Sequence, residues 1–506
     1  MSNRPPRWLV ALIVLISLPL LLPFLYVIER AADVGLARSI ELLWRPRMWE
    51  LLSNTLLLMV FVTLFAIILG TLCAFLLERY RFCGKGFFQV AMTLPLCIPA
   101  FVSCFTWISL TFRVEGLWGT IGIMTLSSFP LAYLPVAATL KRLDRSLEEV
   151  SLSLAKSHAY TFWHAIFPQL KPAIGSSVLL IALHMLVEFG AVSILNYQTF
   201  TTAIFQEYEM AFNNNTAALL SGVLMVICIL VVMGEIRFRG TQTLYQSGKG
   251  VIRPYPLKTL SAGKQILVVS FFTTIFVLSI GVPITMLIYW LKVGNSIESA
   301  VDFGEFFTAF TNSLTISTLG AALTVICALP LVWAAVRYRS KLTIWLDRIP
   351  YLLHAVPGLV IALSLVFFTI NYAYSLYQTF AMVIVAYFML YLPMAQTTLR
   401  SSLEQMSSNI EKVGQSLGRS NFYIFRTLVI PAMLPGIAAA FALVFLNLMK
   451  ELTATLLLTP NDIKTLSTAV WEYTSDAQYA AATPYAIMLV LFSGIPVFLL
   501  KRYGFK

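Results

Sequence analysis

Residues 51–77, LLSNTLLLMVFVTLFAIILGTLCAFLL, contain no charged side chain. An α-helix needs about 20 apolar residues to cross the hydrocarbon core of a bilayer, so this stretch predicts a transmembrane helix. The whole chain has the same character, because 59% of its 506 residues are hydrophobic, 11% are charged and the mean hydropathy is +0.82. A soluble domain carries about a quarter charged residues. The composition therefore indicates a polytopic membrane protein and excludes disorder, a coiled coil and a disulfide scaffold.

Outward from this stretch, the hydropathy pattern predicts an all-α fold of about twelve transmembrane helices in two sets of six. The first set is 8–28, 51–77, 87–112, 117–140, 172–195 and 216–234. The second set is 265–291, 310–336, 349–370, 377–399, 432–448 and 484–500. No cleavage site follows the first span, so we expect it to be a retained signal anchor.

The charged residues predict how the chain is oriented. There are 35 Lys and Arg against 23 Asp and Glu, a net charge of +12, which in a soluble protein would suggest a nucleic-acid partner. Here most of the basic residues fall in alternate loops, as they do in cytoplasmic loops of membrane proteins. We therefore expect both termini in the cytoplasm and no nucleic-acid partner. The six cysteines form no CxxC pair, so neither a zinc site nor a redox motif is indicated.

The second half of the chain repeats the first. At an offset of 258 residues, Arg79-Tyr80-Arg81 matches Arg337-Tyr338-Arg339, and further on, at an offset of 263, Pro168 matches Pro431. Six spans separate the copies, so both run in the same topological sense and are parallel repeats about an axis along the membrane normal. We expect a first repeat at 1–245, a cytoplasmic linker at 246–264 and a second repeat at 265–506.

A long amphipathic loop follows the fourth span of each repeat, near 143–172 and 400–432. It reads LEEVSLSLAKS at 147–157 and IEKVGQSLGRS at 410–420, and each copy then reaches a hydrophobic-Pro pair. Because proline cannot continue a helix, we expect Pro168 and Pro431 to end the helix of the loop. One such loop could be an ordinary interfacial helix. Two at equivalent positions favour a coupling element.

This loop resembles the EAA loop of permeases in ATP-binding-cassette (ABC) importers, where Glu-Ala-Ala, three residues and Gly precede the hydrophobic-Pro pair. In this chain Val150-Ser151 and Val413-Gly414 replace the alanines, Ala155 replaces the first glycine and Lys412 replaces the second glutamate. The resemblance implies the type I importer permease fold, in a bacterial inner membrane, with a short coupling helix that docks on the ATPase. The residues expected to take part are Glu148, Glu149, Ala155, Pro168, Glu411, Gly414, Gly418 and Pro431.

The same resemblance implies the partners. These are two copies of an ABC ATPase on the cytoplasmic face, a periplasmic substrate-binding protein on the outer face, and the lipid bilayer. The nearest approach to a Walker A loop, Gly248-Lys249-Gly250, lacks the upstream glycine and the Ser/Thr after Lys. We therefore expect no enzyme activity and no cofactor on this chain, with ATP and Mg bound by the partner ATPase.

Two further stretches resemble the fused permeases of ferric-iron importers. They are 188–193, EFGAVS, and 450–458, KELTATLLL. That resemblance implies uptake of Fe3+ handed over by a periplasmic binding protein. Related fused permeases carry thiamine or phosphonates, so another small solute stays open as the cargo. A secondary transporter would need no coupling loop, and the clean duplication argues against a membrane scaffold.

The two glutamates of these stretches are candidates for the substrate pathway. Glu188 and Glu451 are equivalent at an offset of 263, late in the fifth span of each repeat, and would face each other across the axis. Intramembrane carboxylates are costly, and hard trivalent iron prefers oxygen ligands, so a transient Fe3+ contact is one hypothesis. The other hypothesis is that the glutamate caps a helix break near Gly190. Tyr208 and Tyr473 are further oxygen donors in outside loops, or else interfacial aromatics; no firmly held metal is expected.

Overall fold

The computed structural model describes residues 5–143, 146–154, 157–239, 257–293, 302–338, 340–353, 356–407 and 409–504, and most of them are helical. Eight helices in this described part are long and apolar enough to cross a membrane. They are Arg7–Val34, Pro46–Arg79, Leu117–Arg142, Phe162–Val187, Asn214–Gly234, Ala262–Val293, Phe303–Tyr338 and Phe380–Gln405.

Three further spans are broken in the middle. The bent pairs are Lys85–Cys97 with Ala100–Leu110 at 93°, Lys341–Leu353 with Gly358–Tyr372 at 106°, and Asn421–Ala432 with Leu434–Leu448 at 71°. If each pair counts as one span, the described residues hold up to eleven, and the shorter apolar helix Tyr479–Gly494 lies where the twelfth was predicted. The predicted all-α polytopic fold is confirmed.

The chain forms two compact units, and the first comprises Met1–Arg45, Ala203–Met225 and Ile297–Tyr473. Its centre is a three-helix packing of α17 (Phe303–Tyr338), α20 (Phe380–Gln405) and α24 (Leu434–Leu448). Gly320 makes this packing close, since a Cβ there would lie 2.9 Å from the Tyr387 ring. Two helices from the start of the chain complete the unit: α1 (Arg7–Ser17) packs on α17 and on α18 (Lys341–Leu353), and α2 (Leu22–Val34) packs on α19 (Gly358–Tyr372).

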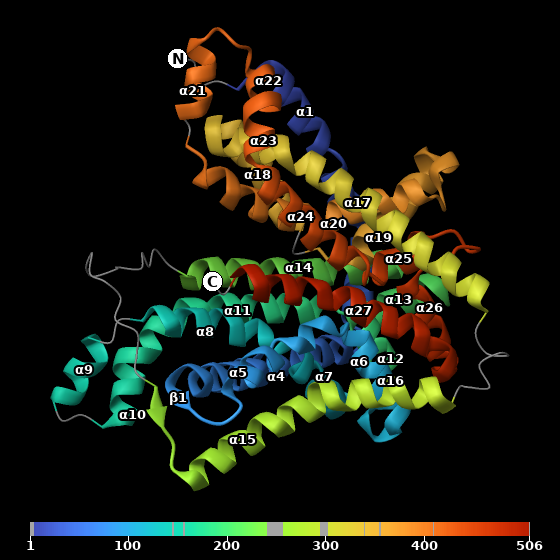
Figure 1. Ribbon diagram of the computed structural model, residues 1–506. Helices are drawn as coiled ribbons and strands as arrows, with labels where there is room; N and C mark the ends of the chain where they lie inside the picture. The colour runs from blue at the N-terminus through green and yellow to red at the C-terminus, as the bar shows by residue number, and fades with distance from the viewer. Residues whose placement is uncertain are drawn as a thin grey trace. The chain divides into compact units, whose positions relative to one another are not determined.

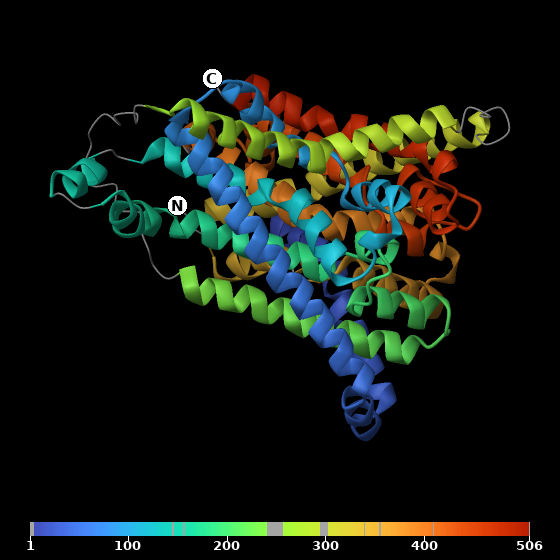
Figure 2. The ribbon, with the colours of Figure 1, turned by 90° about the horizontal axis from the view of Figure 1, so that it is seen from below.

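The second unit comprises Pro46–Thr202, Val226–Ser296 and Thr474–Lys506. Its centre repeats that of the first, with α4 (Pro46–Arg79), α8 (Pro130–Arg142) and α11 (Phe167–Val187) packed together. Figures 1 and 2 show α16 (Val282–Val293) beside α27 (Tyr479–Gly504), and α16 also packs on α6 (Ala100–Leu110). A short parallel pairing joins β1 (Tyr80–Arg81) to β2 (Lys258–Thr259).

The compact units exchange segments between the sequence repeats. The first span of the chain lies in the unit built around residues 303–473, and the span Ala262–Val293 lies in the unit built around residues 46–202. The division at 246–264 therefore marks the sequence repeats, whereas the packed units are interleaved along the chain. Most of that linker, residues 246–256, lies outside the described residues.

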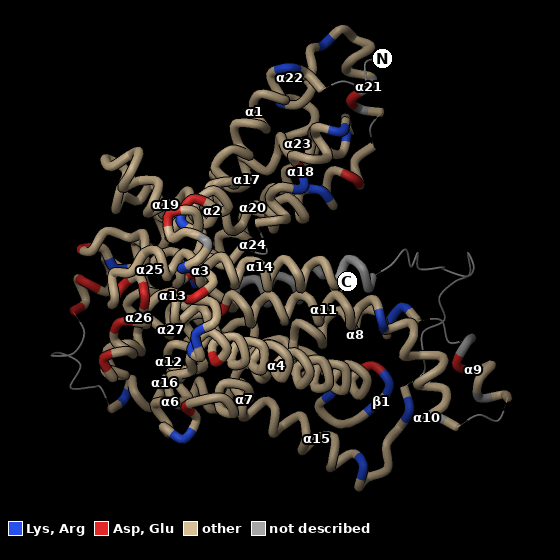
Figure 3. The backbone as a smooth tube through the Cα atoms, turned by 180° about the vertical axis from the view of Figure 1, so that it is seen from behind, with Lys and Arg blue, Asp and Glu red and all other residues tan. Residues whose placement is uncertain are grey.

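Charged residues lie mostly near the ends of the helices, and the middles of the helices carry few of them (Figure 3). Within the second unit, for example, Lys141 and Arg142 end α8 and Arg79 ends α4. This is the distribution that a bilayer requires, because charges at the centre of a span are costly.

Candidate functional site

In the second repeat, the predicted coupling loop is held to its unit by a buried carboxylate. The short helix α21 (Asn409–Ser416) carries Glu411, which accepts hydrogen bonds from Arg337 Nε at 2.6 Å and from Trp333 Nε1 at 3.2 Å. Arg337 Nη2 also donates to the backbone carbonyls of Leu403 and Met406, at the C-terminal end of α20, at 3.4 and 3.1 Å. Arg337 therefore connects α17, α20 and α21.

The first repeat forms the same ion pair. Arg79, the last residue of α4, places Nη1 2.9 Å from Oε2 of Glu148 on α9 (Ser146–Ser153), and the two side chains are 7% and 11% exposed. Arg79 corresponds to Arg337, and Glu148 corresponds to Glu411. Glu149, which occupies the glutamate position of the EAA pattern, is exposed. The buried carboxylate thus belongs to the residue before that position.

A glycine turn ends α21. Gly418 has a φ of +73°, in the left-handed region where a Cβ is strained. The N–H of Gly418 donates to the carbonyl of Gln415 at 3.0 Å, and the N–H of Arg419 donates to that of Gly414 at 3.1 Å. These are the two hydrogen bonds of a Schellman cap, which satisfies the last carbonyls of a helix. Ala155, at the corresponding place in the first repeat, lies outside the described residues.

Beyond the turn, both repeats restart a helix in the same way. Ser157 Oγ accepts the N–H of Tyr160 at 3.1 Å, and Ser420 Oγ accepts that of Tyr423 at 3.2 Å. Each serine satisfies a backbone donor of a helical first turn. In the second repeat, Gly414 lets α21 pack closely on the restarted helix, because a Cβ there would lie 2.9 Å from Ile424 Cγ1.

The expectation that Pro168 ends the helix is wrong. The chain stays helical from α10 (His158–Thr161) through the π-helical turn η4 (Phe162–Ile166) into α11, and Pro168 lies in the first turn of α11. The π-helical turn shifts the hydrogen-bond register just before the proline, where the missing N–H costs least. In the second repeat, η8 (Phe425–Val429) occupies the same place and runs into α23 (Ile430–Ala432), so Pro431 also lies inside the helical segment, and the 71° bend comes after Ala432.

Both candidate pathway glutamates accept hydrogen bonds from the start of the next short helix. Glu188 Oε1 accepts the N–H of Ala191 at 3.0 Å, in α12 (Gly190–Ile194). Glu451 Oε1 accepts the N–H of Ala454 at 3.0 Å, and its Oε2 accepts the N–H and the hydroxyl of Thr455 at 3.0 and 2.7 Å, in α25 (Thr453–Leu458). This geometry is the capping arrangement of the alternative hypothesis. It leaves Glu188 with one carboxylate oxygen 3.7 Å from His184 Nε2.

The backbone around each glutamate is held by repeated hydroxyl contacts. Thr201 Oγ1 donates to the carbonyl of Glu188, and Ser467 Oγ donates to that of Glu451, both at 2.7 Å. The hydroxyls of Thr55 and Ser313 accept the N–H groups of Phe200 and Leu466 at 3.1 and 2.8 Å. The two sites are therefore built to one plan.

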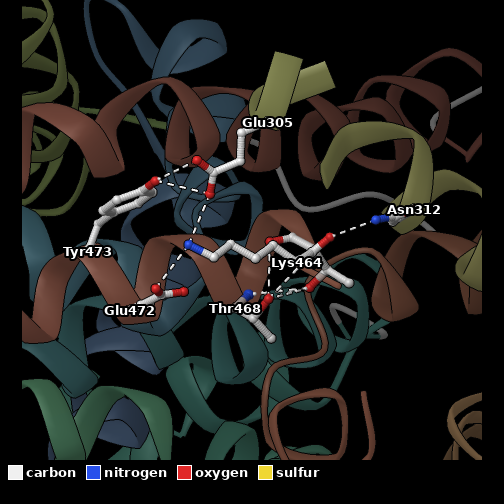
Figure 4. A network of polar contacts seen from close by, with 7 residues as sticks. Glu305, Asn312, Lys464, Thr468, Glu472 and Tyr473 are labelled. Atoms are coloured by element: carbon white, nitrogen blue, oxygen red, sulfur yellow. Dashed lines mark hydrogen bonds and ion pairs between the residues drawn. The ribbon is translucent and has the colours of Figure 1, made fainter. Parts of the chain in front are cut away.

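The two candidate tyrosines lie in different surroundings. Tyr473 on α26 (Leu466–Ser475) donates to Glu305 at 3.1 Å, and Lys464 Nζ lies 2.9 Å from both Glu305 and Glu472 (Figure 4). Tyr208 lies on α13 (Phe200–Glu209), where burial, with smaller effects of neighbouring groups, raises its pKa to about 12. Such a phenol must lose its proton to bind a cation, which the raised pKa opposes.

The ammonium of Lys464 is the centre of this network. Desolvation lowers the pKa of Lys464, but its hydrogen bonds to Glu305 and Glu472 outweigh that effect and hold the pKa above its ordinary range. Among the described residues, no group of three or more His, Cys, Asp or Glu side chains is placed to hold a metal ion.

Sequence reasoning did not assign the residues that hold the loops. The repeated Arg-Tyr-Arg string was recognised as part of the duplication, but its first arginine was given no role. Trp333 and the capping residue Ser420 were also missed. The usable signal was that an arginine and a glutamate are duplicated together, Arg79 with Glu148 and Arg337 with Glu411.

The fold and the duplicated loops define a class of membrane transport component. The chain belongs to the family of binding-protein-dependent transport system inner membrane components, whose model matches residues 66–236 and 327–503. The two matched segments confirm the internal duplication. The protein is thus a multi-pass permease component of an inner membrane.

Individual relatives within this family carry names that state a substrate. The chain is 81% identical to the Fe(3+)-transport system permease protein FbpB 2 of Haemophilus influenzae over 506 residues, the full length of both. It is 22% identical to the ferric transport system permease protein FbpB of Actinobacillus pleuropneumoniae, over 87% of this chain and 69% of that protein. It is 30% identical to the sulfate transport system permease protein CysT of Escherichia coli, over 35% of this chain and 69% of that protein.

Proposed function

We propose that this chain is the permease subunit of an ATP-driven importer that carries ferric iron across the inner membrane. The observation that carries this proposal is the 81% identity, over the full length of both chains, to a permease named for Fe(3+) transport. Iron would reach the permease on a periplasmic binding protein, as the family description implies.

We further propose that two copies of an ABC ATPase dock under the permease, one at each coupling loop. Equal construction of the loops supports this, since each has a buried Arg–Glu pair and a serine-capped restart. ATP and Mg would bind to the ATPase, and this chain would hydrolyse nothing. The docking residues would be those of the two loops, among them Glu149, Gly414 and Gly418.

For the pathway, we propose transient contact of Fe3+ with Glu188 and Glu451. Carboxylate oxygens suit a hard trivalent cation, and the helix-start N–H groups that bind these side chains would hold each carboxylate in a fixed orientation. The orientation that we propose for the whole chain places both termini in the cytoplasm, with α9 and α21 on the same side.

The test is uptake of radiolabelled iron by proteoliposomes. Vesicles would contain the permease with its ATPase and enclose ATP, and the iron-loaded binding protein would be added outside. We expect uptake that needs both ATP and the binding protein. Uptake that continues without ATP but follows an ion gradient would instead support a secondary transporter.

Cargo is tested in the same vesicles. The partial similarity to a sulfate permease, and the 28% identity to the putative 2-aminoethylphosphonate permease PhnV of Salmonella typhimurium over 39% of this chain, favour oxyanions as the competing cargo. Sulfate, 2-aminoethylphosphonate and thiamine in excess should leave iron uptake unchanged. ATP-dependent uptake of one of these solutes, with none of iron, would refute the ferric proposal.

A further inference from the structure

We propose that Arg79 and Arg337 are positioning residues that transmit movement of each coupling loop to the long helix of the same repeat. This inference rests on the proposed docking of an ATPase at each loop. Neither arginine belongs to the EAA pattern, and each lies 69 or 74 residues before its glutamate in the chain, so the contact exists only in the folded protein.

The first step of the argument is burial. In both repeats the arginine and the glutamate are largely shielded from water, at 7% and 11% exposed for Arg79 and Glu148 and at 16% and 9% for Arg337 and Glu411. A surface ion pair exchanges readily with water and resists movement weakly. Separating a buried pair leaves two uncompensated charges, so the two partners are held together when one of them is displaced.

The second step is the position of the pair. Each arginine lies at the C-terminal end of a helix more than 30 residues long, α4 with 34 and α17 with 36. Along their length these helices form the centre of their units, α4 against α8 and α11, and α17 against α20 and α24. A displacement applied at the arginine therefore reaches the packed core of the unit.

The third step is the short, stiff construction of the loop. In the second repeat, α21 is closed by the Gly418 turn and packs at Gly414 against the restarted helix, so it moves as one piece. Glu411 lies in the first turn of α21, and its carboxylate accepts hydrogen bonds from two side chains of α17, Trp333 and Arg337. Arg337 in turn donates to the carbonyl of Leu403 in α20. The ion pair is a direct link from the loop to α17, in addition to the covalent chain.

The second repeat has extra support. Trp333, which donates to Glu411, stacks on Trp8 of α1 with ring centroids 6.2 Å apart and lies 4.6 Å from the Phe425 ring. Arg337 also binds the last carbonyls of α20, where a cation is favoured by the helix dipole. Loss of Arg337 should therefore disturb coupling more than loss of Arg79.

The test compares transport with ATP hydrolysis in proteoliposomes that hold the permease, its ATPase and the binding protein. Variants Arg79→Gln and Arg337→Gln should still assemble and support ATP hydrolysis. Iron transported per ATP should fall by about tenfold in Arg79→Gln, the scale of a lost coupling between two sites, and further in Arg337→Gln. Arg79→Lys should retain most of the iron transported per ATP, because lysine keeps the positive charge beside Glu148. Arg81→Gln, two residues further along at an exposed position, is the matched control and should behave as wild type.

The charge swap is the decisive variant. Arg79→Glu combined with Glu148→Arg restores opposite charges at the same place, so it should recover much of the transport per ATP that either single change loses. A merely structural role predicts equal loss of transport and hydrolysis, in proportion to folded protein. An unchanged ratio in both Gln variants, or no recovery in the swap despite normal assembly, would overturn the inference.

A second measurement does not depend on the cargo. Spin labels at Ser153 on α9 and Leu72 on α4, both exposed, report the distance from the loop to the helix in a variant without the exposed Cys83. With Arg79 present, this distance should stay constant between ATP-bound and nucleotide-free complexes, and in Arg79→Gln it should change. If wild-type vesicles take up no iron but the distances behave as stated, the cargo proposal fails and the inference stands. If the distance between the two labels changes equally in the protein with Arg79 and in Arg79→Gln, the inference is refuted.

Discussion

At the scale of single residues, Gly418 is the clearest case of a sequence feature with a conformational reason. Its φ is +73°, yet nothing lies within 4 Å of the position where a Cβ would be, so the turn needs the glycine for its backbone and not for space.

Gly418→Ala should therefore weaken the end of α21 by about 1 kcal/mol and lower iron transported per ATP, while the protein still inserts. Gly418→Asn is the control, since asparagine tolerates the left-handed conformation better than alanine does. The measurement that compares the two variants is iron transported per ATP with the ATPase bound. Equal and normal coupling in both variants would contradict the role of this turn. We expect a weaker effect at Ala155, where the glycine is already absent.

Glu188 and Glu451 carry the second residue-scale prediction. If they contact iron, Glu188→Gln and Glu451→Gln should each reduce uptake per inserted molecule by more than about tenfold, which corresponds to about 1.4 kcal/mol. The double variant should be little worse than the worse single one, because both residues would serve one pathway. At Glu188 the glutamine oxygen can still accept the N–H of Ala191. At Glu451 one oxygen cannot replace the two that accept from Ala454 and Thr455. A capping role alone therefore predicts less inserted protein, above all for Glu451→Gln, with uptake in proportion to membrane abundance.

At the scale of elements, close approach of α4 and α8 depends on Gly70. A Cβ at this position would lie 2.7 Å from both Ala132 Cβ and the carbonyl oxygen of Phe129, and backbone atoms cannot move aside. Gly70→Ala should destabilise the protein by about 1–3 kcal/mol through overpacking, measured by thermal unfolding in detergent. Gly122→Ala, on α7 (Leu117–Ser128) where nothing lies within 4 Å, should be neutral. Equal stability of the two variants would rule out tight helix contact at Gly70.

The ion pairs of Lys464 with Glu305 and Glu472 join α17 to α26. Their contribution to stability should depend on pH, because the pKa of the lysine is raised. A raised folded-state pKa gives stability that is fully present below the unfolded pKa, about 10.4 for lysine, and is lost as the pH rises through the folded value. The melting temperature of wild type should thus exceed that of Lys464→Met by a constant small amount from pH 6 to 10. Above pH 10 the difference should shrink. A difference that shrinks between pH 6 and 8 would contradict the stated cause.

At the scale of the whole molecule, the orientation can be tested by labelling. A cysteine at Asn461, which is exposed, should react with an impermeant thiol reagent on spheroplasts, whereas one at Ser153 should not. Both would be placed in a variant without Cys83. Labelling of the position on α9 in intact spheroplasts would refute cytoplasmic coupling loops and with them the docking of an ATPase there.

Much of the fold could be predicted from the sequence, and for a local reason. A bilayer demands about 20 apolar residues in each span, so local hydropathy alone located the eight long helices and the three bent spans of the described residues. The range predicted for the twelfth span coincides with a shorter apolar helix, and the fifth predicted range, 172–195, corresponds to a helix at Phe162–Val187. The breaks after Cys97, Leu353 and Ala432 were not predicted. A bent span has the same hydropathy as a straight one, and the bend depends on what the helix packs against.

The sequence by itself determined the membrane class, the duplication and the places of the two repeated amphipathic loops, because local hydropathy and self-similarity show each of them. Only the tertiary structure decided which segments share a compact unit. In an apolar solvent, one apolar helix does not prefer another through hydrophobicity, and small residues and shape choose the partner. The tertiary structure alone also joined Arg79 to Glu148 and Arg337 to Glu411. Residues so far apart in the chain meet only when helix packing brings them together, and burial there makes each charge dependent on the other.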